Sequence, residues 1–199
     1  MTIEGEPRAA PLAPCVALVA MPGAGKSSLG RILARQLGLP FADADHEVEV
    51  RIGMSIREYF QAQGEDAFRD QEQQVLADLT QRGPMILATG GGAVLRPANR
   101  EVLRNRCTVV YLRTSPEELA RRLKHDRSRP LLQVDNPLRK LRELYRQRDP
   151  LYRETAHFII ETGRPSVHAL AVQLAQLAQR VVDLKQGPGS VVLEPPGQL

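Results

Sequence analysis

Short apolar segments alternate with longer amphipathic segments along most of this chain. The short ones are bounded by polar or glycine-rich stretches, which is typical of buried strands. They lie at 15–20, 41–42, 85–89, 108–112 and 157–161. The longer ones repeat apolar residues every three or four positions, the spacing of helices that bury one face. They lie at 26–37, 55–64, 65–80, 115–124, 137–148 and 167–181.

Strands that alternate with helices in this way predict an α/β fold of three layers, in which helices cover a parallel sheet. In such sheets a ligand binds outside the carboxyl ends of the strands. The glycine-rich and acidic motifs of this chain each follow one of the predicted strands. We therefore expect these motifs to contribute to a site at that edge of the sheet.

The length of the chain predicts one domain with extensions at both ends. A chain of 199 residues is long enough to bury a core of its own. Residues 14–183 form the predicted domain, whereas residues 1–13 are expected to be a flexible arm and residues 184–199 a disordered tail. Residues 124–136 are polar, basic and contain proline, and a connection of this length indicates a mobile lid.

Composition narrows the class of protein. With 42% hydrophobic and 25% charged residues, the chain has the composition of a soluble globular protein. Its two cysteines are far apart and match no metal-binding spacing, which favours a reducing compartment. No apolar run reaches the ~18 residues of a membrane span, and acidic residues replace the basic start of a signal peptide. We expect a cytoplasmic protein without a membrane partner.

Positive charge is concentrated in one part of the chain. Residues 113–153 contain twelve Lys or Arg and six Asp or Glu, although the net charge of the whole chain is only +4. Such a concentration implies an anionic partner, which could be a phosphate, a carboxylate or a nucleic acid. Few aromatic residues are interleaved with these cations, and this argues against nucleic acid.

A phosphate-binding loop is predicted after the first strand, where the chain reads Ala20-Met-Pro-Gly-Ala-Gly-Lys-Ser27. The segment matches the P-loop pattern, except that alanine stands at the first glycine position. Gly23 and Gly25 give the backbone the freedom to curl its N–H groups around a phosphate. Lys26 is placed to reach the terminal phosphates and Ser27 to bind Mg²⁺. The N-terminus of the helix that follows also attracts anions.

Two aspartates, Asp43 and Asp45, close the second predicted strand, which we expect to lie beside the first. Residues two apart on a strand project to the same side. One carboxylate could hold Mg²⁺ through water, and the other could bind or deprotonate a hydroxyl group. Spacing alone leaves a second interpretation open, in which Asp45 only caps the helix that follows.

The glycines at 90–92 follow the third predicted strand. They expose backbone N–H groups without side-chain obstruction and favour the close approach of a ligand. Arg129 lies in the predicted lid, where a phosphotransferase needs a cation to neutralise charge on the transferred group. From position alone, Arg69 and Arg148 could be site residues or ordinary surface charges.

Together these motifs resemble those of the shikimate kinases, a family of small P-loop kinases. The resemblance covers about residues 15–182, and its motifs occur in a fixed order. They are Gly-Ala-Gly-Lys-Ser-Ser at 23–28, Asp43-Ala-Asp45, Ser55-Ile-Arg-Glu-Tyr-Phe60, Gly64-Glu-x-x-Phe-Arg69, Gly90-Gly-Gly-Ala-Val94, Arg129-Pro-Leu-Leu132 and Arg148-x-x-Leu-Tyr152. Many P-loop proteins share the first motif, whereas the combination is specific to this family. It implies a five-stranded parallel sheet and phosphorylation of the 3-hydroxyl of shikimate by ATP with Mg²⁺.

The resemblance also implies roles for individual residues. Asp45 would bind the substrate hydroxyls and act as the base, and Lys26 and Arg129 would be its catalytic partners. Arg69 and Arg148 would clamp the carboxylate, a task that suits the bidentate guanidinium group. The implied substrate-binding residues are Asp45, Arg69, Gly90, Gly91, Gly92 and Arg148, and the implied metal-binding residues are Ser27 and Asp43. The implied ATP-binding residues are Gly23, Ala24, Gly25, Lys26, Ser27, Ser28, Arg122, Arg129 and Arg164.

Three further residues are placed near this site by the resemblance. Phe60 and Phe68 resemble pocket walls, although ordinary core packing explains two aromatic residues nearly as well. Glu72 lies one helical turn beyond Arg69 and would orient its side chain.

Two other interpretations remain open at this point. One is another small-molecule kinase on the same scaffold, acting on gluconate or a nucleotide, and the triple glycine argues against it. The other is a nonenzymatic regulator that binds ATP or nucleic acid, and the intact Lys26, Ser27, Asp45 and Arg129 argue against that. No apolar surface stripe demands a protein partner, so we expect a monomer.

Overall fold

The computed structural model describes residues 15–124, 136–162 and 172 of the chain. The predicted N-terminal arm, C-terminal tail and most of the predicted lid lie outside the described residues, as does the last predicted helix apart from residue 172. Arg129 and Arg164 lie there too, so their roles stay predictions.

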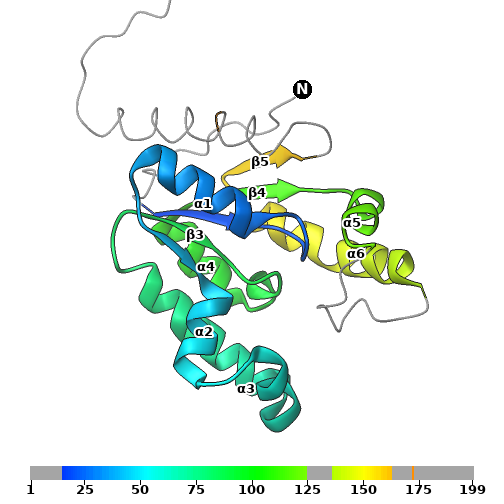
Figure 1. Cartoon of the computed structure of the whole chain (residues 1–199), viewed down its shortest axis with the longest axis horizontal. Coiled ribbons are helices and arrows are strands. Elements are labelled where there is room, and N and C mark those ends of the chain that lie inside the picture. Colours follow the sequence, from blue (N-terminus) through cyan, green and yellow to red (C-terminus); the bar gives the residue numbers. More distant parts are fainter. Residues whose placement is uncertain (1–14, 125–135, 163–171, 173–199) are drawn as a thin grey trace, which may run out of the picture.

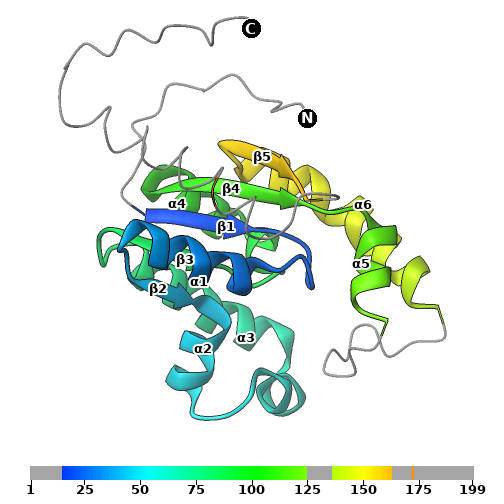
Figure 2. The ribbon, with the colours of Figure 1, turned by 45° about the horizontal axis from the view of Figure 1, so that its top comes forward.

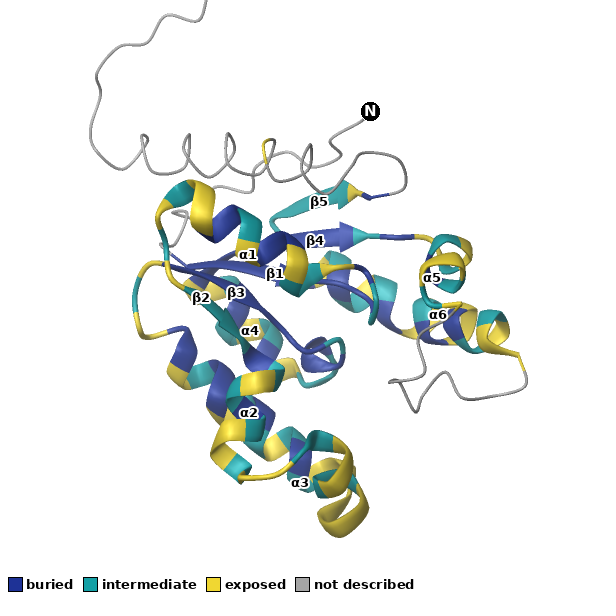
Figure 3. Ribbon diagram, in the orientation of Figure 1, coloured by how far each residue is buried: buried dark blue, intermediate teal, exposed yellow. Residues whose placement is uncertain are grey.

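Five parallel strands form the sheet at the centre of the fold, as predicted (Figure 1). The three inner strands are buried almost throughout, because helices cover both faces of the sheet (Figure 3). The two edge strands are mostly half-buried. The strands are β1 (Cys15–Val19), β2 (Phe41–Asp43), β3 (Met85–Ala88), β4 (Cys107–Arg113) and β5 (Phe158–Glu161).

The order of the strands is β2-β3-β1-β4-β5. The expectation that the second strand lies beside the first is therefore wrong, because β3 is inserted between them. The crossover from β1 to β2 runs one way across the sheet and the crossover from β3 to β4 runs the other way, past β1. The carboxyl ends of β1 and β3 thus lie side by side where the strand order reverses, which is where such sheets bind ligands.

Helices cover the sheet on both sides (Figures 1 and 2). α1 (Lys26–Leu37) lies on one face, and α4 (Pro97–Arg106) and α6 (Pro137–Thr155) lie on the other. The crossover that contains α1 runs from β1 toward β2, whereas those that contain α4 and α6 run toward β4 and β5. Because right-handed crossovers in opposite directions cover opposite faces of a sheet, α1 lies on one face and the other two helices lie on the other. α5 (Pro116–Arg122) packs against α6. Within the described residues, no helix has both the length and the apolar stretch that crossing a membrane requires.

Two further helices project from the sheet beyond β2, namely α2 (Ala44–Ile52) and α3 (Ile56–Leu79) (Figure 2). The predicted capping box is present at the start of α3, where Ser55 Oγ accepts the N–H of Glu58 and the Glu58 carboxylate accepts the N–H of Ser55. At Gly64 the backbone leaves the helical conformation (φ 84, ψ 176). This break agrees with the predicted division into two helices.

One helix that the sequence pattern does not indicate is α4, which follows the short 3-10 helix η1 (Ala93–Leu95). Its sequence is mostly polar, and Asn99 and Leu103 are its buried residues. Two buried positions form no apolar stripe, so hydrophobic periodicity could not reveal this helix.

Another difference concerns α6, which continues past the predicted end at Arg148 and through Pro150 to Thr155. A proline inside a helix removes one backbone hydrogen bond and is destabilising. Tyr152 and Thr155 are buried beyond the proline, and their packing against the rest of the domain compensates for that loss.

The basic stretch at residues 113–153 begins at the end of β4 and includes α5 and most of α6. Many of its cations pair with nearby carboxylates instead of forming an open patch. The ion pairs join Arg113 to Glu161, Arg121 and Arg122 to Glu118, Lys140 to Glu143, Arg142 to Glu117 and Arg153 to Asp149. Each exposed pair adds little stability, but each one places a negative charge directly beside a cation of this stretch.

Candidate active site

A cavity of about 550 Å³ opens at the carboxyl ends of β1, β2 and β3. Its walls come from the loop after β1, from α2, α3 and α6, and from the glycine triplet after β3. Most of the residues that the sequence indicates line this one cavity. They are Gly23, Gly25, Lys26, Ser27, Ser28, Asp43, Asp45, Phe60, Phe68, Arg69, Glu72, Gly90, Gly91, Gly92, Arg122 and Arg148. Ala24 does not line it and is buried.

The phosphate-binding loop curls between β1 and α1. Gly23 and Gly25 have φ angles of 83° and 90°, a region that favours glycine. The Lys26 ammonium donates to the carbonyl of Ala20 at 3.1 Å and so folds back across the loop. Ala20 itself is fully buried, and all described residues with positive φ are glycines. The position that departs from the P-loop pattern therefore needs no glycine conformation.

Ser27 on α1 and Asp43 at the end of β2 meet beside this loop. Ser27 Oγ donates to Asp43 Oδ2 at 2.5 Å. Asp43 is also the N-cap of α2, because its Oδ1 accepts the backbone N–H of Asp45 at 3.2 Å. Asp45 therefore lies in the first turn of a helix, and the expectation that both aspartates lie on one strand is wrong. The capping role belongs to Asp43, since aspartate at this position favours the start of a helix.

The acidity of Asp45 is shifted by its surroundings. Burial raises the pKa of its carboxyl above the ordinary value, because the charged form loses contact with water. The neighbouring Asp43 carboxylate adds to the rise in pKa, whereas Lys26 and Arg69 oppose it. A carboxylate whose pKa is raised holds a proton more readily, which suits it to act as a base.

The glycine triplet allows other groups of the cavity to close around the backbone. A Cβ atom on Gly90 would lie 2.5 Å from Oδ1 of Asp45 and 2.7 Å from Oε1 of Glu72. A Cβ atom on Gly91 would lie 2.9 Å from the ring of Pro22 in the phosphate-binding loop. The close approach that the sequence predicts for a ligand thus also exists between these glycines and the protein.

Arg69 is held by carboxylates of its own helix. Its guanidinium donates to Glu72 Oε2 at 2.8 Å and to Glu65 Oε1 at 3.0 Å, and it lies 5.1 Å from the ring centroid of Phe68. The contact that the sequence predicts between Glu72 and Arg69 is therefore present. Glu72 is 1% exposed, and its Oε1 has no hydrogen-bond partner among the described residues.

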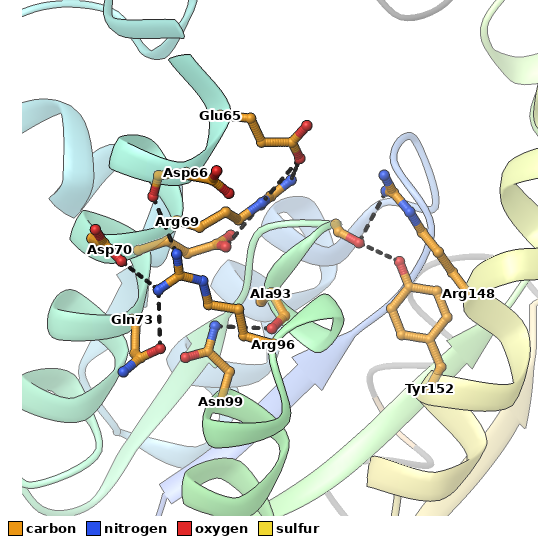
Figure 4. Close-up of polar contacts among 12 residues, drawn as sticks. Glu65, Asp66, Arg69, Asp70, Gln73, Ala93, Arg96, Asn99, Arg148 and Tyr152 are labelled. Atoms are coloured by element: carbon orange, nitrogen blue, oxygen red, sulfur yellow. Dashed lines mark hydrogen bonds and ion pairs between the residues drawn. The ribbon is translucent and has the colours of Figure 1, made fainter. Parts of the chain in front are cut away.

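Arg148 reaches the cavity from α6 (Figure 4). Its side chain is buried, and its Nη1 donates to the carbonyl of Gly91 at 3.2 Å. Within the part of the chain that the structure describes, its Nε has no hydrogen-bond partner. A buried cation with an unpaired N–H is costly by itself and is stabilised when an anion enters the cavity. Arg69 and Arg148 thus bring two guanidinium groups to one site.

Apolar side chains complete the wall of the cavity. The ring centroids of Phe60 and Phe68 lie 4.6 Å apart, so these residues are both pocket wall and packed pair. The cavity is also lined by residues that the sequence patterns do not indicate as site residues, namely Pro22, Ile56, Thr89, Leu123, Leu141 and Leu144. The spacing of Leu141, Leu144 and Arg148 along one helical face is the signal that could have indicated two of them.

Arg122 lies at the α5 side of the cavity. Its Nε donates to Glu118 and its Nη2 donates to the carbonyl of Thr162, both at 2.9 Å. These bonds tie the end of α5 to the residue that follows β5. The structure therefore fixes the position of Arg122 at the cavity, whereas its predicted contact with adenine stays a prediction.

The fold and the cavity define a class of protein. A P-loop, a lysine and a hydroxyl–carboxylate pair form one part of the site, where a nucleotide phosphate would fit. A carboxylate of raised pKa and two guanidinium groups form the other part, which suits a small acidic acceptor with a hydroxyl group. This combination is that of a P-loop kinase that acts on a small molecule. A sequence profile of the shikimate kinases matches residues 22–183, and the chain belongs to this family.

Individual relatives agree with this assignment. The chain is 58% identical over 158 residues to the shikimate kinase of Paracidovorax citrulli, a match that covers 78% of this chain and 86% of that protein. It is 51% identical over 177 residues to the shikimate kinase of Ralstonia nicotianae, covering 89% and 90% of the two chains. The solved structure of the shikimate kinase from Acinetobacter baumannii in complex with shikimate is 47% identical, with a TM-score of 0.80, and the match covers 85% of this chain and 95% of that one. The family resemblance inferred from the motifs is confirmed.

Proposed function

We propose that this protein transfers the γ-phosphoryl group of ATP to the 3-hydroxyl of shikimate and releases shikimate 3-phosphate and ADP. This reaction belongs to the route to chorismate and the aromatic amino acids. The observation that carries the proposal is one cavity that holds a P-loop, the Asp45 carboxylate and two guanidinium groups, Arg69 and Arg148. Shikimate has a carboxylate for the guanidinium groups and hydroxyls for the aspartate. Membership of the shikimate kinase family supports the same reaction.

ATP is proposed to bind with its phosphates in the P-loop. The backbone N–H groups of residues 23–28 and the N-terminus of α1 would surround the phosphates. Lys26 would neutralise charge on the terminal phosphates as the γ-phosphoryl group moves. Arg122 and Arg164 are proposed to flank the adenine, and Arg129 to contact ATP from the predicted lid.

Mg²⁺ is proposed to bind at Ser27 and Asp43. Their oxygens lie 2.5 Å apart beside the P-loop, and hydroxyl and carboxylate oxygens are the donors that Mg²⁺ prefers. Ser27 would bind the ion directly, and Asp43 would hold it through a water molecule. When bound, the ion neutralises charge on the β- and γ-phosphates of ATP.

Shikimate is proposed to lie between α3, α6 and the glycine triplet. Arg69 and Arg148 would bind its carboxylate, and the backbone N–H groups of residues 90–92 would approach it closely, since no side chain obstructs them. Nε of the buried Arg148 has no partner among the described residues, and this supports the placement, because a substrate carboxylate would supply an acceptor.

The chemical step is an in-line displacement at the γ-phosphorus. The 3-hydroxyl oxygen of shikimate forms a bond to phosphorus while the bond from phosphorus to the β,γ-bridging oxygen breaks, and ADP leaves with that electron pair. The hydroxyl proton passes to Asp45, whose raised pKa suits it to hold a proton. The lid would exclude water, so that ATP is not hydrolysed in place of transfer. We also propose that the enzyme acts as a cytoplasmic monomer without nucleic acid.

Identification of the product tests this function. Purified protein is incubated with Mg·ATP and shikimate, and the products are followed by phosphorus and carbon NMR. We expect a phosphomonoester on carbon 3 of the shikimate ring, formed in equal amount to ADP. Inorganic phosphate as the only product, or a phosphate ester at another ring position, would contradict the proposed reaction.

A further inference from the structure

The three carbonyl oxygens of the glycine triplet are held in two different ways. The carbonyl of Gly90 accepts the N–H of Ala93 at 3.2 Å, and the carbonyl of Gly92 accepts the N–H of Leu95 at 2.9 Å. Both bonds belong to the backbone turn that leads into η1. The carbonyl of Gly91 is held by side chains of α6 instead.

Two α6 side chains donate to that oxygen (Figure 4). Tyr152 Oη donates to the Gly91 carbonyl at 2.5 Å and Arg148 Nη1 donates to it at 3.2 Å. Burial raises the pKa of Tyr152 above its ordinary value, so the hydroxyl stays protonated and remains a donor at neutral pH. Tyr152 makes the shorter of the two bonds, although it does not itself line the cavity.

The position of the Tyr152 hydroxyl is fixed by packing. Tyr152 has no exposed surface, and its ring stacks on Tyr111 with 4.9 Å between centroids. The Tyr111 hydroxyl donates to Asp149 Oδ1 at 2.8 Å, and Asp149 Oδ2 accepts Arg153 Nε at 2.7 Å. Both aromatic hydroxyls thus have partners, but Tyr152 is the one that bonds to the glycine triplet.

Peptide geometry connects this bond with the cavity. The carbonyl of Gly91 and the N–H of Gly92 belong to one planar peptide group, and no described peptide bond is cis. In a trans peptide the C=O and N–H groups point in opposite directions. Because the carbonyl points toward α6, the N–H of Gly92 points away from α6. Glycine has little intrinsic preference for one backbone conformation, so this orientation depends on what holds the carbonyl.

We propose that Tyr152 is a positioning residue for the acceptor substrate, because its hydroxyl fixes the Gly91–Gly92 peptide group. The bond has two consequences for the cavity. It aims the N–H of Gly92 away from α6 and toward the acceptor, and it gives the Gly91 carbonyl a second donor besides Arg148. The inference rests on the proposed function, since it concerns how shikimate is held.

Replacement of the hydroxyl alone tests the inference. Tyr152→Phe keeps the ring stack and removes the bond to Gly91. Tyr111→Phe is the matched control, since it removes an equally buried hydroxyl of the same stack whose partner is Asp149. We expect Tyr152→Phe to raise the KM for shikimate about tenfold, as for loss of one buried hydrogen bond, with the KM for ATP unchanged. Tyr111→Phe should lower the melting temperature comparably and leave the KM for shikimate unchanged.

Equal effects of the two variants on the KM for shikimate would overturn the inference, because a purely structural role predicts that result. A second readout does not depend on turnover. In protein with isotope-labelled glycine, Tyr152→Phe should shift the amide resonances of Gly91 and Gly92, and Tyr111→Phe should leave them in place. Unshifted resonances in Tyr152→Phe would also overturn it. Failure of the wild-type protein to phosphorylate shikimate would instead contradict the proposed function, and the amide resonances would still decide the role of Tyr152.

Discussion

The guanidinium group of Arg69 occupies the space that a side chain at Gly92 would need. A Cβ atom built on Gly92 would overlap with both terminal nitrogens of Arg69. Arg69 also donates to Glu72 and Glu65, so a shift of its guanidinium group would strain or break those bonds. Arg69 can therefore hold this position only because Gly92 has no side chain.

Gly92→Ala should therefore impair binding of the acceptor. Displacement of Arg69 should raise the KM for shikimate at least about tenfold, the cost of losing one charge-assisted hydrogen bond, with the KM for ATP within about twofold. Steady-state kinetics with each substrate varied in turn checks this. Gly83→Ala is the control, because Gly83 has a positive φ of 100° but lies just before β3, at the end of the strand away from the cavity. It should lower the melting temperature and leave both KM values unchanged.

Asp45→Asn should abolish most turnover and stabilise the protein at neutral pH. The folded protein raises the pKa of Asp45 above its ordinary value, so in the pH range between the two values the folded state binds more protons than the unfolded state. Stability from this group therefore falls as pH rises through that range. Asparagine removes the cost of the buried charge.

Melting temperatures of wild type and Asp45→Asn as a function of pH check this. The variant should melt higher at neutral pH, and the difference should disappear below the ordinary pKa of an aspartate. ATP binding, measured by calorimetry, should be unchanged. A variant with wild-type turnover would show that Asp45 is not the base.

Asp43→Asn should weaken the response to Mg²⁺ without loosening the helix that follows. An asparagine oxygen can still accept the N–H of Asp45 and cap α2, but it carries no charge for the ion. We expect the Mg²⁺ concentration that gives half-maximal rate to rise about tenfold or more. The control is Asp43→Ala, which should show the same shift and also a lower melting temperature. An unchanged Mg²⁺ response in both variants would exclude Asp43 from the metal site.

His157 should make stability depend on pH at the edge of the sheet. Its Nδ1 accepts the N–H of Val109 at 3.0 Å, and this requires an unprotonated nitrogen. Burial lowers the pKa of His157 below 6.5, and the nearby Arg104 lowers it further. In the pH range below the ordinary value the unfolded state binds the extra proton, so this contribution to stability is lost as pH falls through that range.

His157→Asn keeps an acceptor for Val109 that is not protonated in this range. Thermal unfolding of both proteins from neutral to mildly acidic pH should show a smaller loss of stability in the variant. Parallel curves for the two proteins would contradict the role given to His157.

Much of the fold can be predicted from the sequence, because buried strands and amphipathic helices leave periodic patterns. The order of the strands cannot, since no local pattern records that β3 is inserted between β1 and β2. The helix α4 is missed because it buries few apolar residues. The end of α6 is missed because burial of Tyr152 outweighs the local effect of Pro150.

Some features of the candidate site could also be predicted from the sequence, and others could not. The P-loop, the aspartates and the glycine triplet could be predicted, since each stands at the end of a strand and the sheet brings them together. The placement of Asp45 on a helix could not, because the choice between strand and helix depends on the cap made by Asp43. Tyr152 and Gly91 both stand in motifs of the family, but the motifs do not show that the side chain of one bonds to the backbone carbonyl of the other, which is far away in the sequence.

The identity of the acceptor substrate can be established by measuring the release of ADP. Purified protein with Mg·ATP is given shikimate, gluconate or a nucleoside monophosphate in parallel assays. We predict ADP release that depends on shikimate, with the other two acceptors at the rate of ATP alone. Release with gluconate or a nucleotide but not with shikimate would contradict the proposed function and the roles of Arg69 and Arg148.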